Sequence, residues 1–200
     1  MANTHPSLKV INGFPAERTL EPGEIAMAQR MFGNSIDYPK VRIKVWDTLA
    51  GVMSKDRPVA PNGHLYLHPQ DPKLSLDYSQ GSFRQKELFM HEMTHVWQNH
   101  SGRNLPLSAA PTQIRNGFAR VFGGNPRTGY DYTLDTTKKL SDYNVEQQGE
   151  IIADYYMARY ENGTLPKGRT RAEYEQVLSE FLRDPLYDKK IRDRYEQERK

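Results

Sequence analysis

The spacing of apolar residues along the chain predicts helices joined by a few short strands. Over Glu21–Phe32 the apolar residues recur at helical spacing, and Gly33 follows directly, which is typical of a helix end. Strict alternation of apolar and polar residues over Val41–Val45 predicts a half-buried strand, and His64–His68 predicts another short one after a turn. The pattern favours an α+β fold, mainly helical with a small sheet.

A longer helix is predicted from Phe83 onward, with Ser82 as its N-cap and Gly102 beyond its far end. Its residues divide into two neighbouring stripes at spacings of three and four. One stripe is apolar and indicates a face turned to the core: Phe89, Met93, Val96 and Trp97. The adjacent stripe is largely polar and holds Leu88, Glu92, His95 and Asn99. We expect this helix to carry a site and to be held rigidly by the core.

The second half of the chain predicts further helices, over Tyr143–Tyr156, Thr170–Arg183 and Asp184–Glu198. The Gly- and Pro-rich segment from Pro106 to about Lys139 predicts a large loop with one short helix inside it. Such a loop is uncommon in a compact domain unless it serves a site. We expect one domain over residues 1–200, with a helical tail from about residue 164, and the small sheet bordering the site helix.

The string His91-Glu92-Met93-Thr94-His95 lies in the middle of the first long helix. Residues four apart share a helix face, so both imidazoles can reach one metal ion. Glu92 points slightly away from that ion and can take a proton from a water held there. This is the HExxH arrangement of two zinc ligands and a general base. The alternative is a core helix with two hydrogen-bonded histidines, but a buried carboxylate between them is costly without a cation.

A catalytic zinc ion needs a third protein ligand, and the chain has no Cys. The metzincin proteases take a further His six residues after the motif, where this chain has Ser101. None of the other histidines continues the motif, namely His5, His64, His68 and His100. The third ligand is therefore expected on another element.

Three carboxylates fall on one face of the helix predicted over Tyr143–Tyr156. Glu146, Glu150 and Asp154 follow one another in steps of four. Stacked carboxylates repel one another unless a cation or hydrogen-bond donors lie nearby. The pattern fits a position beside zinc and two imidazoles, and the alternative is a solvated charged face.

Composition and charge limit the partners. The net charge of +3 is mild, and the basic residues after Lys189 alternate with acidic ones, which is typical of an exposed helix and not of a nucleic-acid arm. No apolar run approaches the length of a membrane-spanning helix. The N-terminus lacks the layout of a signal peptide. We expect no nucleic-acid partner, no membrane span, and synthesis in the cytoplasm without a classical signal.

The string Glu150-Ile151-Ile152-Ala153-Asp154 resembles the E-x-x-x-D element of the glutamate zincins. That resemblance implies that Glu150 is the third zinc ligand. It also implies that Asp154 accepts the free ring N–H of a ligand histidine and so fixes its orientation. Glu146 is the competing ligand, and otherwise it lies in the outer layer of the site with Asp154.

Longer strings carry a second resemblance, among them Glu24-Ile25-Ala26-Met27-Ala28, His91-Glu92-Met93-Thr94-His95-Val96-Trp97-Gln98 and Asn144-Val145-Glu146-Gln147-Gln148. Up to about residue 160 the chain resembles the metallopeptidase domain at the C-terminus of certain VgrG spike proteins of type VI secretion systems, and their stand-alone Vgr-related or Rhs-associated forms. The resemblance implies a zincin-like fold and a zinc ion held by two His and a Glu. It also implies an antibacterial effector that acts in a neighbouring cell's periplasm, with a secretion spike and an immunity protein as partners.

The expected activity is hydrolysis of a protein or peptide substrate, with zinc at His91, His95 and Glu150 and with Glu92 as general base. A donor for the oxyanion is not identified; the candidates are Tyr155, Tyr156 and the segment 115–132. Two alternatives stay open: an amide hydrolase of peptidoglycan that uses the same site, and a zinc-bearing binding protein without activity. Glu92 argues against the second, because structural zinc sites are normally closed by four ligands.

Overall fold

The structure is a computed structural model, and it describes residues 9–45, 60–101, 131–166 and 168–187. Its helices are α1 (Pro22–Phe32), α2 (Phe83–His100), α4 (Val145–Tyr160), α5 (Arg171–Val177) and α6 (Ser179–Arg183). The strands are β1 (Val10–Ile11), β2 (Phe14–Pro15), β3 (Glu17–Thr19), β4 (Arg42–Val45) and β5 (Leu65–Leu67). Four single 3₁₀ turns complete the order: η1 (Tyr38–Lys40), η2 (Pro61–Gly63), η3 (Tyr78–Gln80) and η4 (Leu140–Asp142). This mixture of helices with a small sheet is the α+β class expected from the sequence.

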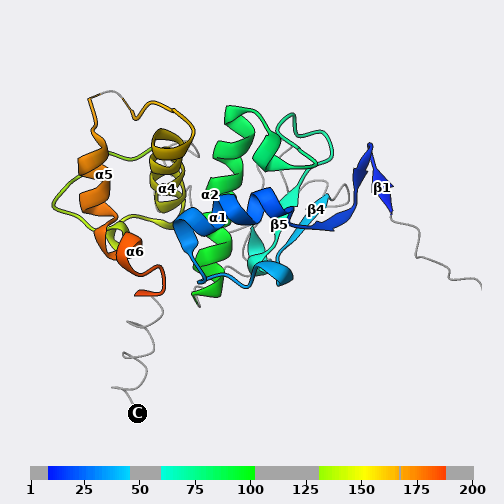
Figure 1. The fold of residues 1–200 in the computed structure, drawn as a ribbon, viewed down its shortest axis with the longest axis horizontal. Helices are drawn as coiled ribbons and strands as arrows, with labels where there is room; N and C mark the ends of the chain where they lie inside the picture. The colour runs from blue at the N-terminus through cyan, green and yellow to red at the C-terminus, as the bar shows by residue number, and fades with distance from the viewer. Residues whose placement is uncertain (1–8, 46–59, 102–130, 167, 188–200) are drawn as a thin grey trace, which may run out of the picture.

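Helix α2 is the central element of the fold. Figure 1 shows it between α4 on one side and the strands β4 and β5 on the other, with α1 crossing in front. Because neighbours lie on several sides, every residue from Phe89 to Gln98 is buried. The sequence predicted a core face and an adjacent polar face, and the structure buries both. The helix begins at the predicted N-cap, where Ser82 and Gln85 form a reciprocal capping box.

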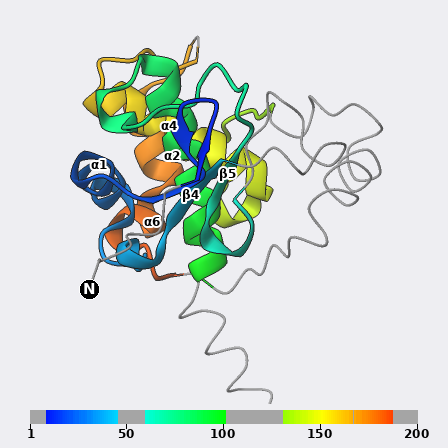
Figure 2. The same ribbon diagram turned by 90° about the vertical axis from the view of Figure 1, so that its right-hand side faces the viewer.

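The larger sheet has the strand order β3-β4-β5, with β3 antiparallel and β5 parallel to β4. β4 alternates half-buried and buried residues as its sequence predicts, whereas all three residues of β5 are buried. Figure 2 views the molecule from the side of the strands, with β4 and β5 in front of α2. The small sheet therefore borders the long helix, and β1 and β2 form a separate two-stranded hairpin.

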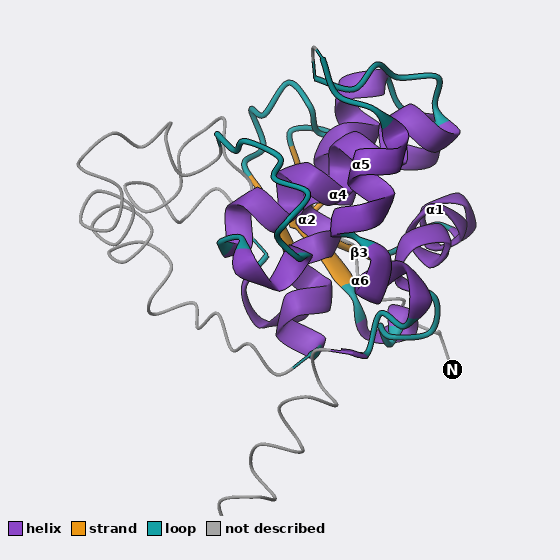
Figure 3. Cartoon of the chain, turned by 90° about the vertical axis from the view of Figure 1, so that its left-hand side faces the viewer, coloured by secondary structure: helices purple, strands orange, loops and turns teal. Residues whose placement is uncertain are grey.

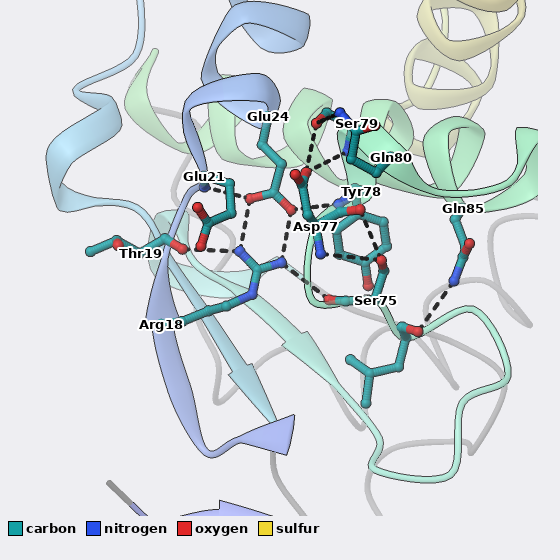
Figure 4. Close-up of polar contacts among 11 residues, drawn as sticks. Arg18, Thr19, Glu21, Glu24, Ser75, Asp77, Tyr78, Ser79, Gln80 and Gln85 are labelled. Carbon is teal, nitrogen blue, oxygen red and sulfur yellow. Dashed lines mark hydrogen bonds and ion pairs between the residues drawn. The ribbon is translucent and has the colours of Figure 1, made fainter. Parts of the chain in front are cut away.

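An ionic cluster ties α1 to the segment that leads into α2 (Figure 4). Arg18 of β3 donates to both carboxylate oxygens of Glu24, at 2.8 and 2.7 Å. The same carboxylate accepts the backbone N–H groups of Glu21 and Tyr78, at 2.8 and 2.9 Å. Arg18 also donates to the carbonyl oxygen of Ser75 at 3.2 Å. Because η3 ends only two residues before the N-cap of α2, this cluster fixes where α2 begins.

The C-terminal helices differ from the prediction of one helix over Thr170–Arg183. The chain bends at Leu178 and forms α5 and α6, which Figure 3 shows as separate helices. The bend brings Phe181 against Trp97 of α2, with ring centroids 5.0 Å apart. Trp97 also donates its indole N–H to the carbonyl of Pro185 at 2.7 Å. Burial of these rings favours the bend over a straight helix.

Some predictions concern residues that lie outside the described ranges. These are Gly102, the loop from Pro106 to residue 130 with its short helix, and residues 188–198 of the last predicted helix. Within the described residues, no helix combines the length and apolar character that crossing a membrane requires.

Candidate metal centre

The two motif histidines lie one turn apart on α2 with their rings in contact. His91 and His95 are both buried, and their ring centroids are 4.8 Å apart with the planes at 80°. Their Nε2 atoms approach to 3.1 Å. The helix alone produces this pairing, because residues four apart are neighbours on its surface. Two nitrogens thus converge on one point, as the sequence predicted.

Glu146, in the first turn of α4, completes the group. Its Oε2 atom lies 3.3 Å from Nε2 of His91 and 3.3 Å from Nε2 of His95. The three atoms form a nearly equilateral triangle, and tetrahedral zinc ligands at their usual distances stand roughly 3.3–3.4 Å from one another. Among the described residues, these three form the group of His and acidic side chains compact enough to hold a metal ion. The donor set of two imidazoles and one carboxylate suits zinc.

Glu150 takes a different position from the one expected of a third ligand. Its Oε1 atom lies 3.2 Å from Nδ1 of His91, on the opposite side of the ring from Glu146. The side chain is 36% exposed. Relative to the expectation, Glu146 and Glu150 have exchanged places: Glu146 lies on the side where the ring nitrogens converge, and Glu150 holds the outer nitrogen of one imidazole.

The axial register of the two antiparallel helices explains this exchange. At one end Gln98 of α2 donates to the carbonyl of Val145 and to Oε1 of Gln148, both at 3.0 Å. At the other end Lys86 pairs with Glu161 at 2.6 Å. With the first turn of α4 held at the level of Gln98, the carboxylate nearest the histidine pair comes from that first turn. These contacts link residues about 50 or more positions apart in the chain, so the sequence pattern alone does not determine the register.

Asp154 lies in a cluster of tyrosines. Its Oδ2 atom accepts a short hydrogen bond from the Tyr132 hydroxyl and a longer one, 3.4 Å, from Tyr174. The expected acceptor role towards a ligand histidine is filled by Glu150 at Nδ1 of His91. The hydrogen bonds of Asp154 instead connect α4 to α5 and to the segment that precedes η4.

Gln98 orients the second histidine, a role that the motif pattern did not predict. Nδ1 of His95 lies 2.8 Å from Oε1 of Gln98. Because the amide nitrogen of Gln98 donates to Val145 and Gln148, its oxygen is the acceptor, so Nδ1 of His95 carries the proton. In the neutral imidazole the lone pair of His95 is then on Nε2, the atom that faces Glu146. The spacing of three residues between His95 and Gln98 is the signal that could have suggested the contact.

Burial and the close contacts shift the pKa values of the group in opposite directions. Burial lowers the pKa of His91, but the carboxylates of Glu146 and Glu150 outweigh it and hold that pKa well above its ordinary value. For His95 burial also lowers the pKa, and Glu146 again produces a net rise. Burial raises the pKa of Glu146, but the two imidazoles outweigh it and leave that pKa well below its ordinary value. The arrangement therefore favours a negative carboxylate beside positive charge on the imidazole side.

Glu92 is buried beside this group without a fixed partner for one oxygen. Its Oε2 atom has no hydrogen-bond partner in the described part of the chain. Burial raises the pKa of its carboxyl group, and the neighbouring His95 and His91 only partly offset that rise. A carboxylate with a raised pKa and a free oxygen is suited to accept a proton.

The other candidates from the sequence lie elsewhere or are engaged by other groups. The Tyr155 and Tyr156 hydroxyls donate to Glu175 and Glu161, at 3.1 and 3.4 Å, so neither is free to stabilise an oxyanion. Nδ1 of His100 accepts the backbone N–H of Asp37. A cavity of about 420 Å³ lies beside Glu150, and its other walls include Asp131, Tyr132, Arg169 and Tyr174.

Comparison with known proteins agrees with the resemblance seen in the sequence. No family model matches the chain. The type VI secretion system spike protein VgrG2b of Pseudomonas aeruginosa is 38% identical over 175 residues, which is 86% of this chain and 16% of the spike protein. The chain thus spans about a sixth of that protein's length.

A solved structure covers the same region. The effector domain of Pseudomonas aeruginosa VgrG2b is similar with a TM-score of 0.63 and 36% sequence identity, over 81% of this chain and 82% of that domain. Identity at this level over most of both chains is evidence of common descent, and the fold agrees. The chain belongs to the family of the VgrG2b effector domain.

Proposed function

We propose that this protein is a zinc-dependent metallopeptidase and an antibacterial effector of type VI secretion. The observation that carries the activity is the triangle of Nε2 of His91, Nε2 of His95 and Oε2 of Glu146, with edges of 3.1, 3.3 and 3.3 Å. A buried acid with an unpartnered oxygen, Glu92, stands on the same helix. Together these match the donor set and the general base that a zincin active site requires.

The three side chains of the triangle would hold the ion. Their lone pairs converge in a buried place, and the geometry leaves each imidazole with its outer nitrogen bound to Gln98 or Glu150. When bound, zinc acts as a Lewis acid that polarises a carbonyl group and lowers the pKa of water. Three protein ligands leave a position for substrate or water, which is typical of catalytic and not of structural zinc sites.

The residues of the chain supply the rest of the chemistry. Glu92 takes a proton from the attacking water at Oε2 and returns it to the nitrogen of the leaving amine. Burial raises the pKa of Glu92, which makes it a stronger base and then a competent acid. Gln98 and Glu150 keep the proton of each imidazole on Nδ1, so that both Nε2 atoms remain available.

The effector role rests on the kinship with the VgrG2b domain. In that role the protein is delivered on a secretion spike to the periplasm of a target cell, and an immunity protein protects the producer. The substrate is a protein or peptide. Amide hydrolysis in peptidoglycan needs the same site, so an experiment has to distinguish protein from peptidoglycan as the substrate.

The test compares the native protein with Glu92→Gln, each loaded with one equivalent of zinc. Casein and purified cell wall serve as separate substrates. Glu17→Gln, an exposed glutamate on β3, is the matched control. We expect the native protein and the control to cleave casein, and Glu92→Gln to keep its zinc and lose turnover by at least about 100-fold. Cleavage of the cell wall alone would replace peptidase with peptidoglycan hydrolase, and undiminished cleavage by Glu92→Gln would refute the proposed base.

A further inference from the structure

Helix α4 passes the His91 ring so closely that a side chain at the point of contact has no room. A Cβ atom placed on Gly149 would lie 2.8 Å from Cε1, 2.9 Å from Nδ1 and 3.1 Å from Nε2 of His91. Real Cβ atoms essentially never come within 3.0 Å of such neighbours. The backbone of α4 therefore lies directly against the imidazole.

Three neighbouring side chains hold the ring in its present position. His95 stands edge-on to it, with 4.8 Å between centroids. Glu146 holds Nε2 at 3.3 Å, and Glu150 holds Nδ1 at 3.2 Å. The residue is buried. A methyl group at position 149 would have to displace either the His91 ring from these contacts or α4 itself.

A glycine inside a helix weakens it relative to alanine, because glycine loses more backbone entropy when it is ordered. Gly149 is the fifth residue of a helix of 16 and lies just past the capped first turn. Helix stability alone therefore favours alanine here. The contact with His91 is the feature of the structure that requires glycine.

We propose that Gly149 is a positioning residue: it forms the seat against which the His91 ring lies, and this seat keeps Nε2 of His91 in the triangle with His95 and Glu146. The part of this inference that concerns zinc rests on the proposed function, whereas the steric part does not. With alanine at 149, the ring moves off α4 and its Nε2 atom leaves the position where the other two donors converge.

A double-mutant cycle on the metal-free protein tests the steric part. Thermal unfolding is measured for the native protein, Gly149→Ala, His91→Ala and the double variant. We expect Gly149→Ala to lower the Tm when His91 is present. In the His91→Ala background it should raise the Tm, since the methyl group fills vacated space and alanine is the better helix former. An equal change of Tm in both backgrounds would refute the proposed contact between Gly149 and the His91 ring.

Zinc binding tests the functional part. Chelator competition should give a Kd for Gly149→Ala that is roughly 10–100-fold weaker than that of the native protein, as for other losses of support around metal ligands. The visible absorption of the cobalt-substituted variant should also change, because that spectrum reports ligand geometry. Native affinity together with a native cobalt spectrum in Gly149→Ala would contradict the proposal.

Gly23→Ala is the matched control. A Cβ on Gly23, in α1, would lie 2.1 Å from Oγ of Ser79, so this change also strains the fold, but far from the histidines. Gly23→Ala should lower the Tm and leave the zinc Kd and the cobalt spectrum unchanged. An equal loss of zinc affinity in Gly23→Ala would mean that the loss in Gly149→Ala comes from general strain of the fold, and would contradict the proposed role of Gly149. Failure of the native protein to bind zinc would refute the proposed function. The metal-free double-mutant cycle would still test the steric contact between Gly149 and His91.

Discussion

Glu24 and Glu146 are both buried carboxylates near the ends of helices, but their partners differ in kind. Glu24 is fully buried, and it receives two hydrogen bonds from the guanidinium of Arg18 and two from backbone N–H groups (Figure 4). The partners of Glu146 are the Nε2 atoms of two histidines, at 3.3 Å each.

This difference in partners distinguishes a carboxylate that stabilises the fold from one that is available to bind a metal ion. A guanidinium and a backbone N–H donate at every physiological pH, so the charge of Glu24 is compensated by groups that do not change. An imidazole compensates a carboxylate only when it carries a proton, or when a cation binds both. The cluster at Glu24 is complete within the chain, whereas the cluster at Glu146 requires protons or a metal ion. A buried charge is therefore not diagnostic by itself, and its partners decide what it does.

The largest expected effect on stability comes from breaking the Glu24 cluster. Arg18→Met leaves a buried carboxylate without its cation, and we expect a loss of about 3–5 kcal/mol in the free energy of unfolding. Chemical denaturation measures this. Arg42→Met is the control, because Arg42 pairs at 3.6 Å with the exposed Glu17 and such pairs contribute at most about 1 kcal/mol. An equal loss of unfolding free energy in both variants would contradict the larger contribution expected of the Glu24 cluster.

The Glu146 cluster should respond through zinc and not through the fold. Glu146→Ala should lose zinc by several orders of magnitude in affinity, because one of three ligands is gone. Glu150→Ala should keep zinc with roughly 10–100-fold weaker binding, because it supports His91 from behind. Competition with a chromogenic chelator gives both constants. Retained zinc in Glu146→Ala with loss in Glu150→Ala would restore Glu150 as the ligand.

A smaller effect is expected at Gln98, which holds Nδ1 of His95. Gln98→Met keeps the volume and removes the acceptor, so zinc binding should weaken by about 10-fold. Gln176→Met is the control, since Gln176 bonds only a surface carbonyl, that of Thr136, among the described contacts. Unchanged zinc affinity in Gln98→Met would mean that the His95 ring is oriented by packing alone.

The smallest effect is the pH dependence of the metal-free protein. The pKa values of His91 and His95 are raised in the folded state, so their contribution is complete below 6.5 and is lost as the pH rises through the folded values. The pKa of Glu146 is lowered, so its contribution is present above 4.5 and is lost as the pH falls through the folded value. The Tm difference between the native protein and Glu146→Gln should therefore be largest between pH 4.5 and 6.5. A difference that does not vary with pH would contradict the coupling.

The sequence predicted what depends on local spacing. The pairing of His91 with His95 follows from one helical turn, and α1, α2 and β4 begin within a residue of their predicted starts. The choice between Glu146 and Glu150 could not be predicted in this way. It depends on how far α4 is shifted along α2, and that register is set by contacts between distant segments.

Other features were missed for similar reasons. β3 is only three residues long and pairs with β4, more than 20 residues away, so it has no clear periodic signal. The bend at Leu178 has no Gly or Pro to mark it, and it is explained by the aromatic contacts of Phe181 with α2. The contacts of Gln98 with Val145 and Gln148, and the close approach of Gly149 to His91, become visible only when α2 and α4 are placed together.

The most direct test of the proposed centre is an anomalous-scattering map at the zinc edge, from crystals of the full chain grown with zinc. We expect one strong peak in contact with Nε2 of His91, Nε2 of His95 and Oε2 of Glu146, with Glu150 remaining at Nδ1 of His91. A map without a peak at this position, or a peak bound by Glu150 in place of Glu146, would contradict it.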